Sequence, residues 1–286
     1  MRIKIRHEIV QRFDPSARRV IEALRLTPRS HEGQHVLEWR IDVEADCRLR
    51  RAEDAFGNLA DMFSLQAPPS ELRLVAEGVV ETFDFAGVVR GALERFPPDL
   101  FLRDTALTAP DAALRALADA ARGADLIERL HALMRLVRDR LEQPAAEESA
   151  PGGLVASSLD VTPAAQALER GGGSARDLAH VFIAAARCMG APARIVSGYA
   201  ALDAPGGGQG ACEGAAHAWA EAHVEGVGWI GFDSAQVICP QERHVRIACG
   251  LDWLDAAPVR ASSQGVIAQE ARVELRPSVV QRQSQQ

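Results

Sequence analysis

A histidine and an aspartate on two adjacent segments could carry acid–base chemistry. His217 opens a stretch in which polar and small residues alternate, and Asp233 closes the apolar stretch that follows the glycines at 226 and 228. Alternation predicts a strand and the glycines predict a hairpin, so the two side chains should lie on paired strands within a few residues of facing each other. Such an aspartate would orient the imidazole and stabilise its charged form. Taken singly, His217 could be a partly buried strand histidine and Asp233 a turn residue.

A glycine run opens the helix that comes before this hairpin. Gly171-Gly-Gly173 is followed by Ser174, a typical N-cap residue, and by Asp177, which resembles the acidic half of a capping box. Residues 178–189 are apolar nearly all round, which predicts a buried helix. The start of such a helix stabilises a thiolate, a phosphate or an oxyanion. The glycines could equally make only a tight turn, and a phosphate-binding P-loop is excluded because its lysine is missing.

The sequence implies no metal site and no cofactor. His217 and His223 share a strand face but stand about 20 Å apart along an extended chain, too far to bind one ion. The cysteines are odd in number, scattered and without a C-x-x-C pair, which argues against a disulfide framework and a cysteine zinc site. Such thiols are typical of a reducing cytosol. They are Cys47, Cys188, Cys212, Cys239 and Cys249.

Elements that would position these residues follow from periodicity. Alternation over 2–11, 36–45 and 72–82, with a turn at 54–58, predicts an antiparallel sheet or sandwich. Residues 111–121 and 124–143 have helical spacing, and 144–153 should form an exposed loop. We therefore predict an α+β protein with an N-terminal β domain over 1–105 and a core over 106–276. The core would hold helices at 111–143, the catalytic region at 154–236 and closing strands at 237–276, before a flexible tail at 277–286.

Composition limits the classes of partner and the cellular location. The chain has 286 residues, a formal net charge of −7, 47% hydrophobic and 25% charged residues, which is typical of a globular protein. A mildly acidic chain without a basic stripe is a poor binder of nucleic-acid phosphates. The N-terminus lacks the apolar core of a signal peptide, and no run of about 18 apolar residues exists to span a membrane. We expect a soluble cytoplasmic protein, whose oligomeric state the sequence does not give.

The motifs taken in order resemble the bacterial transglutaminase-like superfamily, whose core is shared with papain-like cysteine proteases. The motifs are S-x-R-D-L-A from Ser174, V-S-G-Y at 196–199, H-A-W from His217 and G-W-x-G-F-D ending at Asp233. The early strands and the 54–58 turn resemble the β-rich N-terminal region of the bacterial members. The resemblance implies a nucleophile-bearing helix packed on an antiparallel sheet and a Cys-His-Asp triad. Its positions here are Ala175, His217 and Asp233.

The chain departs from the family pattern at the nucleophile. Position 175 is alanine, which cannot form a thioester, whereas a cysteine there would be activated by the helix and by the imidazole. Ser174 should point elsewhere while capping the helix, Cys188 lies near the far helix end, and Cys212 is in a glycine-rich segment. We favour loss of the nucleophile over replacement by any of these. A smaller departure is Ser234-Ala-Gln236 after the aspartate, where family members often continue Pro-Thr-Asn.

Three functions follow from these residues. The first is acyl transfer by a cysteine protease or amidase type of hydrolase, acting on a peptide bond or a glutamine side chain and inactive as written, whether by engineering or by natural loss. Hydrolysis and transamidation stay open because the same triad performs both. The second is a noncatalytic pseudoenzyme that binds a peptide or protein partner in the cleft. The third is a scaffold that assembles through its N-terminal sheet.

Overall fold

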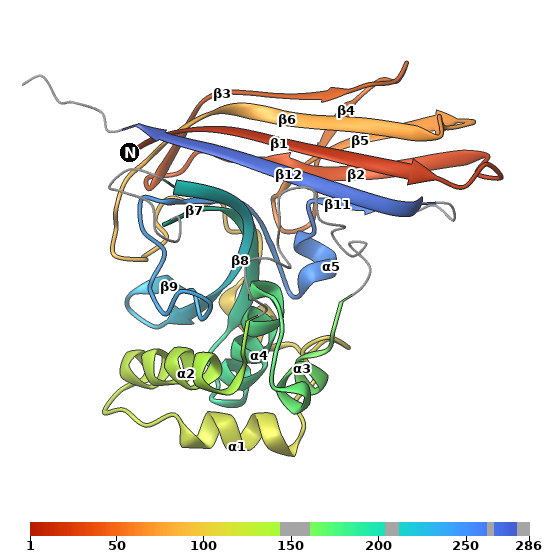
Figure 1. Ribbon diagram of the computed structural model, residues 1–286. Coiled ribbons are helices and arrows are strands. Elements are labelled where there is room, and N and C mark those ends of the chain that lie inside the picture. Colours follow the sequence, from red (N-terminus) through yellow and green to blue (C-terminus); the bar gives the residue numbers. More distant parts are fainter. Residues whose placement is uncertain (144–160, 204–211, 262–265, 279–286) are drawn as a thin grey trace, which may run out of the picture.

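The computed structural model describes residues 1–143, 161–203, 212–261 and 266–278. It confirms the α+β class: three antiparallel four-stranded sheets are combined with a group of helices at one end of the molecule (Figure 1). The first half of the chain contains β1 (Arg2–Phe13), β2 (Arg19–Thr27), β3 (Gln34–Val43), β4 (Arg50–Glu53), β5 (Leu59–Gln66), β6 (Glu71–Thr82), the 3₁₀ helix η1 (Pro98–Leu102), α1 (Ala112–Ala120) and α2 (Leu126–Arg140). The second half contains α3 (Ala164–Arg170), α4 (Ala175–Cys188), β7 (Ala193–Asp203), β8 (Cys212–Val224), β9 (Gly228–Phe232), β10 (His244–Gly250), α5 (Trp253–Ala256), β11 (Val259–Ala261) and β12 (Val266–Ser278).

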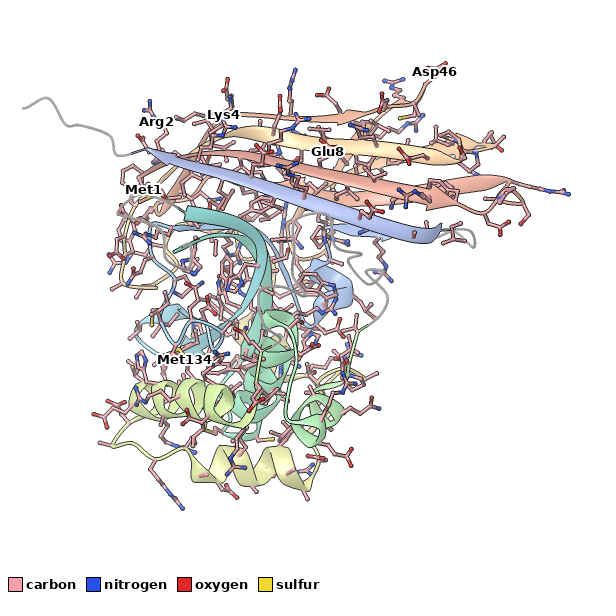
Figure 2. All side chains as sticks on the ribbon, viewed as in Figure 1. Met1, Arg2, Lys4, Glu8, Asp46 and Met134 are labelled. Atoms are coloured by element: carbon pink, nitrogen blue, oxygen red, sulfur yellow. The ribbon has the colours of Figure 1, made fainter. Side chains whose placement is uncertain are left out.

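The N-terminal strands form two sheets with a shared apolar core. One sheet has the order β12-β1-β6-β3 and the other β11-β2-β5-β4. Strict alternation on β1 buries Ile3, Ile5 and Ile9 on one face, as the period of two requires. Lys4 and Glu8 alternate with them on the charged face of the same sheet (Figure 2). The strands expected from alternation over 2–11, 36–45 and 72–82 are therefore confirmed as β1, β3 and β6.

Strand pairing corrects the expected membership of the closing strands. We predicted that 237–276 would complete the core, and β10 does lie in the core sheet. However, β11 pairs with β2, and β12 pairs with β1 along its whole length. The chain thus returns to the N-terminal sheets at its end. Periodicity could not predict this, because alternation identifies a strand but not its partner. The tail at 279–286 lies outside the described residues, and β12 reaches Ser278.

The core sheet has the order β10-β7-β8-β9 and carries the buried helix α4. Every residue of α4 from Asp177 to Arg187 is buried, which explains why its sequence is apolar nearly all round. The helix packs on Ala220 and Ala222 of β8, whose small side chains allow close approach. Helices α1, α2 and α3 surround α4 at the end of the molecule far from the N-terminal sheets (Figure 1). Met134 belongs to the buried stripe of α2 (Figure 2).

The helices expected at 111–121 and 124–143 are present as α1 and α2. Helix α3 was not predicted, because its seven residues are too few to establish a helical period. The predicted loop at 144–153 lies outside the described residues. Among the helices of the described ranges, none is long and apolar enough to cross a membrane.

A buried carboxyl group between the N-terminal sheets makes the stability of the fold depend on pH. Glu22 on β2 is 0% exposed, and neither carboxyl oxygen has a hydrogen-bond partner among the described residues. Burial raises the pKa of Glu22 to about 7. The folded state therefore favours the protonated carboxyl, and stability is lost as the pH rises from the unfolded value of 4.5 through about 7.

The Glu22→Gln variant is expected to be more stable than the parent at pH 8, by up to about 3 kcal/mol, and nearly equal to it at pH 4.5. Urea unfolding at both pH values measures the difference. Glu38→Gln, at an exposed position of β3, is the matched control and should change little at either pH. An equal effect of Glu22→Gln at both pH values would exclude this explanation.

Candidate active site

The hairpin of β8 and β9 brings His217 and Asp233 into direct contact. The ladder between the strands ends at the pair Ala220 and Phe232, and Asp233 follows immediately. Nε2 of His217 lies 2.6 Å from Oδ2 of Asp233. Because an ionised carboxylate only accepts hydrogen bonds, Nε2 carries the proton and Nδ1 is the ring nitrogen left to exchange a proton with a reacting group. His217 is 9% exposed and Asp233 is 0% exposed, so the pair is shielded from water.

The carboxylate of Asp233 is held by five donors. Its Oδ1 accepts the backbone N–H groups of Ala235 and Gln236 at 3.0 and 3.2 Å. Its Oδ2 accepts from the Gln236 side-chain amide at 2.8 Å, in addition to the two histidines. Burial alone would raise the pKa of Asp233, but the charge of His217 and the hydrogen bonds from His217 and His244 lower that pKa below its ordinary value. Asp233 is therefore a permanent anion at neutral pH.

A second histidine, which the sequence analysis did not predict, also contacts the carboxylate of Asp233. His244 is the first residue of β10, and its Nε2 lies 3.3 Å from Oδ2 of Asp233. Its Nδ1 accepts the backbone N–H of Gln241 at 3.2 Å, which leaves the proton on Nε2. His244 is thus a donor to Asp233. Its signal in the sequence is weak, a histidine that opens an alternating strand after Pro240, because the contact joins segments that are not paired with each other.

The same three side chains have the composition of a metal site, but their protonation opposes it. The candidate ligand atoms of His217, Asp233 and His244 all lie within 4.8 Å of one another. A metal at Nε2 of His244 would require the proton on Nδ1, where the N–H of Gln241 already donates. The arrangement fits a hydrogen-bonded cluster better than a metal centre. His223, the other histidine considered as a ligand, packs its ring 5.3 Å from that of Trp229.

The glycine run makes a tight turn before α4, which was one of the two predictions for this segment. Gly171 ends α3 in the left-handed region with φ of 70°, and a Cβ on Gly173 would come within 2.7 Å of the Asp177 Cβ. The backbone N–H of Ser174 donates to Oδ2 of Asp177 at 2.9 Å, which confirms the acidic half of the capping box. Ala175 is the first residue of α4 and is half-buried. Position 175 therefore stands at the positive end of the helix.

Helix α4 runs along the core sheet with its beginning directed toward the His217 end of β8. Near its C-terminus, Nη2 of Arg187 donates to the carbonyl oxygen of Ala193 at 2.8 Å, where β7 begins. Further back, the ring of Phe182 stacks on Phe232 at 5.1 Å between centroids. Ala175 lies about 10 Å beyond Phe182 along the helix. His217 lies about 10 Å beyond Ala220, the partner of Phe232, along β8. Ala175 and His217 therefore lie on the same side of the contact between Phe182 and Phe232 along their respective elements.

Residues that could have replaced the missing thiol are placed as follows. The Ser174 hydroxyl donates to Asp177 at 2.9 Å and is occupied there. Cys188 is an exposed residue at the opposite end of α4. Partial desolvation of its thiol raises the pKa of that thiol. The side chain of Cys212 lies outside the described residues.

Two adjoining cavities lie between the core sheet and the N-terminal strands. The first, of about 60 Å³, is lined by His244 and Trp219 from the core and by Phe83 and Phe85 from the segment after β6. The second, of about 330 Å³, has polar walls that include Arg29, Glu94 and Cys249. Both cavities are lined by His31 and Arg246. The N-terminal region therefore forms one wall of the space beside His244.

Comparison with known families identifies the class to which this fold and site correspond. Residues 3–81 match the bacterial transglutaminase-like N-terminal region, and residues 115–234 match the transglutaminase-like superfamily. The core is thus a transglutaminase-like domain preceded by the N-terminal region found in bacterial members, which confirms the resemblance seen in the sequence. The second match includes all three positions 175, 217 and 233.

Individual relatives extend over nearly the whole chain. An uncharacterized protein of Mycobacterium leprae is 28% identical over 92% of this chain and 94% of its own length. One from Mycobacterium tuberculosis is 24% identical over 82% of this chain and 79% of its own. The crystal structure of a proposed cysteine protease from Cytophaga hutchinsonii has a TM-score of 0.73 and 22% identity, covering 96% of this chain and 90% of that one. This structural likeness establishes the fold.

Proposed function

We propose that positions 175, 217 and 233 form an acyl-transfer site of the cysteine class, and that this chain carries the site without its nucleophile. The observation that supports the proposal best is the buried contact of His217 with Asp233, with 2.6 Å between Nε2 and Oδ2. The site is of a type that acts on an amide, either a peptide bond or a glutamine side chain. Ala175 makes the chain as written inactive in this reaction.

Chemistry at this site would proceed in two halves when a thiol occupies position 175. His217 Nδ1 takes the thiol proton, and the thiolate attacks the amide carbonyl carbon. The carbonyl oxygen becomes an oxyanion, which the positive end of the α4 dipole stabilises. The C–N bond then breaks as His217 returns the proton to the leaving amine. Water or a second amine takes the acyl group and restores the thiol.

One structural feature bears on how the ring meets position 175. Alternation along β8 places His217 on the face opposite Ala218 and Ala220, whereas α4 packs on Ala220 and Ala222. The ladder between β8 and β9 ends at Ala220, so β8 has no β9 partner at His217. We therefore propose that the side chain at position 175 reaches the imidazole of His217 around the edge of β8 that has no β9 partner.

Restoring the thiol tests the proposed reaction. The Ala175→Cys variant is expected to cleave members of a panel of peptide amides, and the parent chain should leave them intact. Adding a primary amine to the assay distinguishes a transamidase, which forms the amine adduct, from a hydrolase, which releases the acid. A folded variant without turnover on any amide, with or without amine, would count against the proposal.

Ala175 itself favours a second function, a noncatalytic protein that binds a peptide or protein partner in the cleft. The cavities beside His244 would supply the binding space. Calorimetric titration of the parent chain with the same peptide panel should then give saturable heats, and Ala175→Cys should bind equally well without turnover. An absence of heat for every peptide would speak against this function. The cytoplasmic location, the lack of nucleic-acid and membrane partners and the lack of a cofactor remain predictions from composition.

A further inference from the structure

The carboxylate of Asp233 is shared by two imidazole rings, only one of which the proposed reaction uses. His217 lies 2.6 Å from Oδ2 and His244 lies 3.3 Å from the same oxygen. The side chains of both histidines are at least nine-tenths buried. We infer that His244 is a positioning residue, which holds Asp233 in the one orientation that keeps His217 Nδ1 free for proton transfer. This inference rests on the proposed function.

The direction of the hydrogen bonds at His244 carries the argument. The N–H of Gln241 can only donate, so Nδ1 of His244 is unprotonated and Nε2–H points at Asp233. His244 therefore contributes a donor directed at Asp233. Together with the Gln236 amide at 2.8 Å, it gives Oδ2 two donors in addition to His217.

The ring of His244 is itself held by aromatic packing. It meets the ring of Trp219 edge to face at 5.5 Å between centroids, while the centroid of His217 lies 6.1 Å away. Trp219 lies two residues after His217 on β8 and shares its face. The two histidines and the tryptophan thus form one packed group around the carboxylate.

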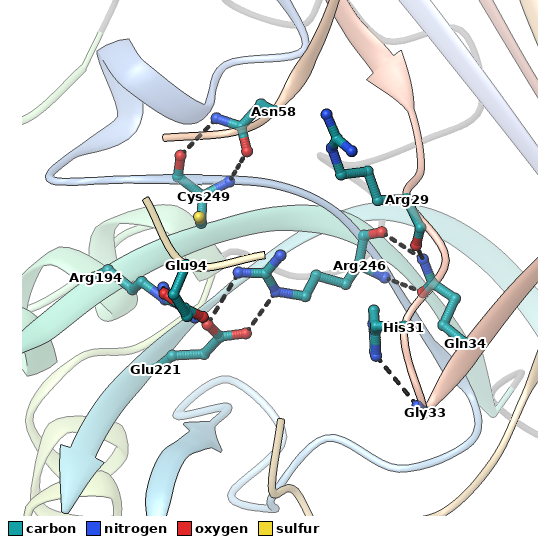
Figure 3. A network of polar contacts seen from close by, with 10 residues as sticks. All are labelled: Arg29, His31, Gly33, Gln34, Asn58, Glu94, Arg194, Glu221, Arg246 and Cys249. Atoms are coloured by element: carbon teal, nitrogen blue, oxygen red, sulfur yellow. Dashed lines mark hydrogen bonds and ion pairs between the residues drawn. The ribbon is translucent and has the colours of Figure 1, made fainter. Parts of the chain in front are cut away.

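The N-terminal region fixes the strand on which His244 stands. β10 is the edge strand of the core sheet, and its outer backbone groups are paired by two side-chain amides (Figure 3). Gln34 accepts the N–H of Arg246 at 2.8 Å and donates to its carbonyl oxygen at 2.9 Å. Asn58 does the same for Cys249 at 2.8 and 2.7 Å. The position of His244 therefore depends on residues from β3 and from the turn before β5.

Two substitutions of His244 by side chains of similar size distinguish the effect of its hydrogen-bond donor from the effect of its shape. In the Ala175→Cys background, His244→Leu is expected to lower kcat about tenfold, the loss typical of one hydrogen bond to a charged group, with KM changed less than about twofold. His244→Gln retains an N–H donor and should recover kcat to within about threefold of the background. Equal kcat for the Leu and Gln variants would overturn the inference. If the Ala175→Cys variant with His244 unchanged has no activity, that result would instead count against the proposed function.

A spectroscopic measurement on the parent chain, which carries Ala175, tests the inference without any activity. ¹⁵N spectra of the imidazole rings should show His244 with Nε2 protonated and Nδ1 unprotonated, and His217 with Nε2 protonated. His244→Leu should shift the His217 ring resonances, and His244→Gln should restore them. A proton on Nδ1 of His244, or His217 resonances that ignore both substitutions, would overturn the positioning role even if the variants lose activity.

Discussion

The Ala175→Cys thiol is expected to react with iodoacetamide at pH 6 about ten times faster than an unperturbed cysteine. An ordinary thiol with a pKa near 8.5 is roughly 0.3% thiolate at this pH. A pKa lowered to about 6 by the start of α4 and by charged His217 makes the thiolate population about half. The lower basicity removes part of this gain, since nucleophilicity falls with the pKa, and about tenfold remains. Mass spectrometry of the labelled peptides measures the rate at each cysteine.

The chain contains its own comparison for this experiment. Cys188 is an exposed residue at the other end of α4, and partial desolvation raises the pKa of its thiol. Its labelling at pH 6 should therefore be slow. The parent chain gives the background for all five natural cysteines. If the introduced thiol is labelled no faster than Cys188, position 175 lacks the electrostatic activation that the proposed reaction needs.

Glu221→Gln is expected to destabilise the fold by about 3–5 kcal/mol, the typical cost of removing one partner from a buried ion pair. Glu221 on β8 is 1% exposed and lies between two arginines (Figure 3). It accepts from Nε of Arg194 at 2.7 Å and from Nε of Arg246 at 2.8 Å. Burial favours the neutral acid, but the two arginines outweigh it and lower the pKa of Glu221 to about 2. The substitution leaves both guanidinium groups without this counter-charge.

Urea unfolding at pH 7 measures this loss, and the pH dependence checks its cause. A lowered pKa gives stability that is present above the unfolded value of 4.5 and lost as the pH falls toward 2. The difference between parent and Glu221→Gln should therefore shrink in acid. Glu94→Gln is the matched control: Glu94 binds the same Arg194 at 2.7 Å, but its side chain is 36% exposed, so its removal should cost less. Equal costs would mean that burial of the counter-charge is not the source of the effect.

Local patterns in the sequence predicted many of the strands and helices, and they predicted the contact of His217 with Asp233. Alternation identified β1, β3, β6 and β8, because each buries one face and a period of two is visible in a single strand. The pairing of His217 with Asp233 could be anticipated because a tight glycine turn joins their strands. In each case the information lies within a short window of the chain.

What the sequence did not reveal depends on contacts between distant segments. The contact of His244 with Asp233, the pairing of β12 with β1, and the clamping of Cys249 by Asn58 join residues that no local period connects. The arginine and glutamate network is hidden for the same reason, since charged residues on strands are ordinarily solvated. The functional role of position 175 came from family resemblance, because alanine has no chemistry of its own to detect.

The central claim is that His217, oriented by Asp233, acts on the side chain at position 175. Its most direct test compares the iodoacetamide labelling rate of Ala175→Cys at pH 6 with that of the double variant Ala175→Cys, His217→Ala. We predict that removing the imidazole slows labelling of the introduced thiol several-fold, because only the contribution of α4 then remains, and leaves Cys188 unchanged. An identical rate in the two variants, with both proteins folded, would contradict the claim, because the thiol would then be independent of His217.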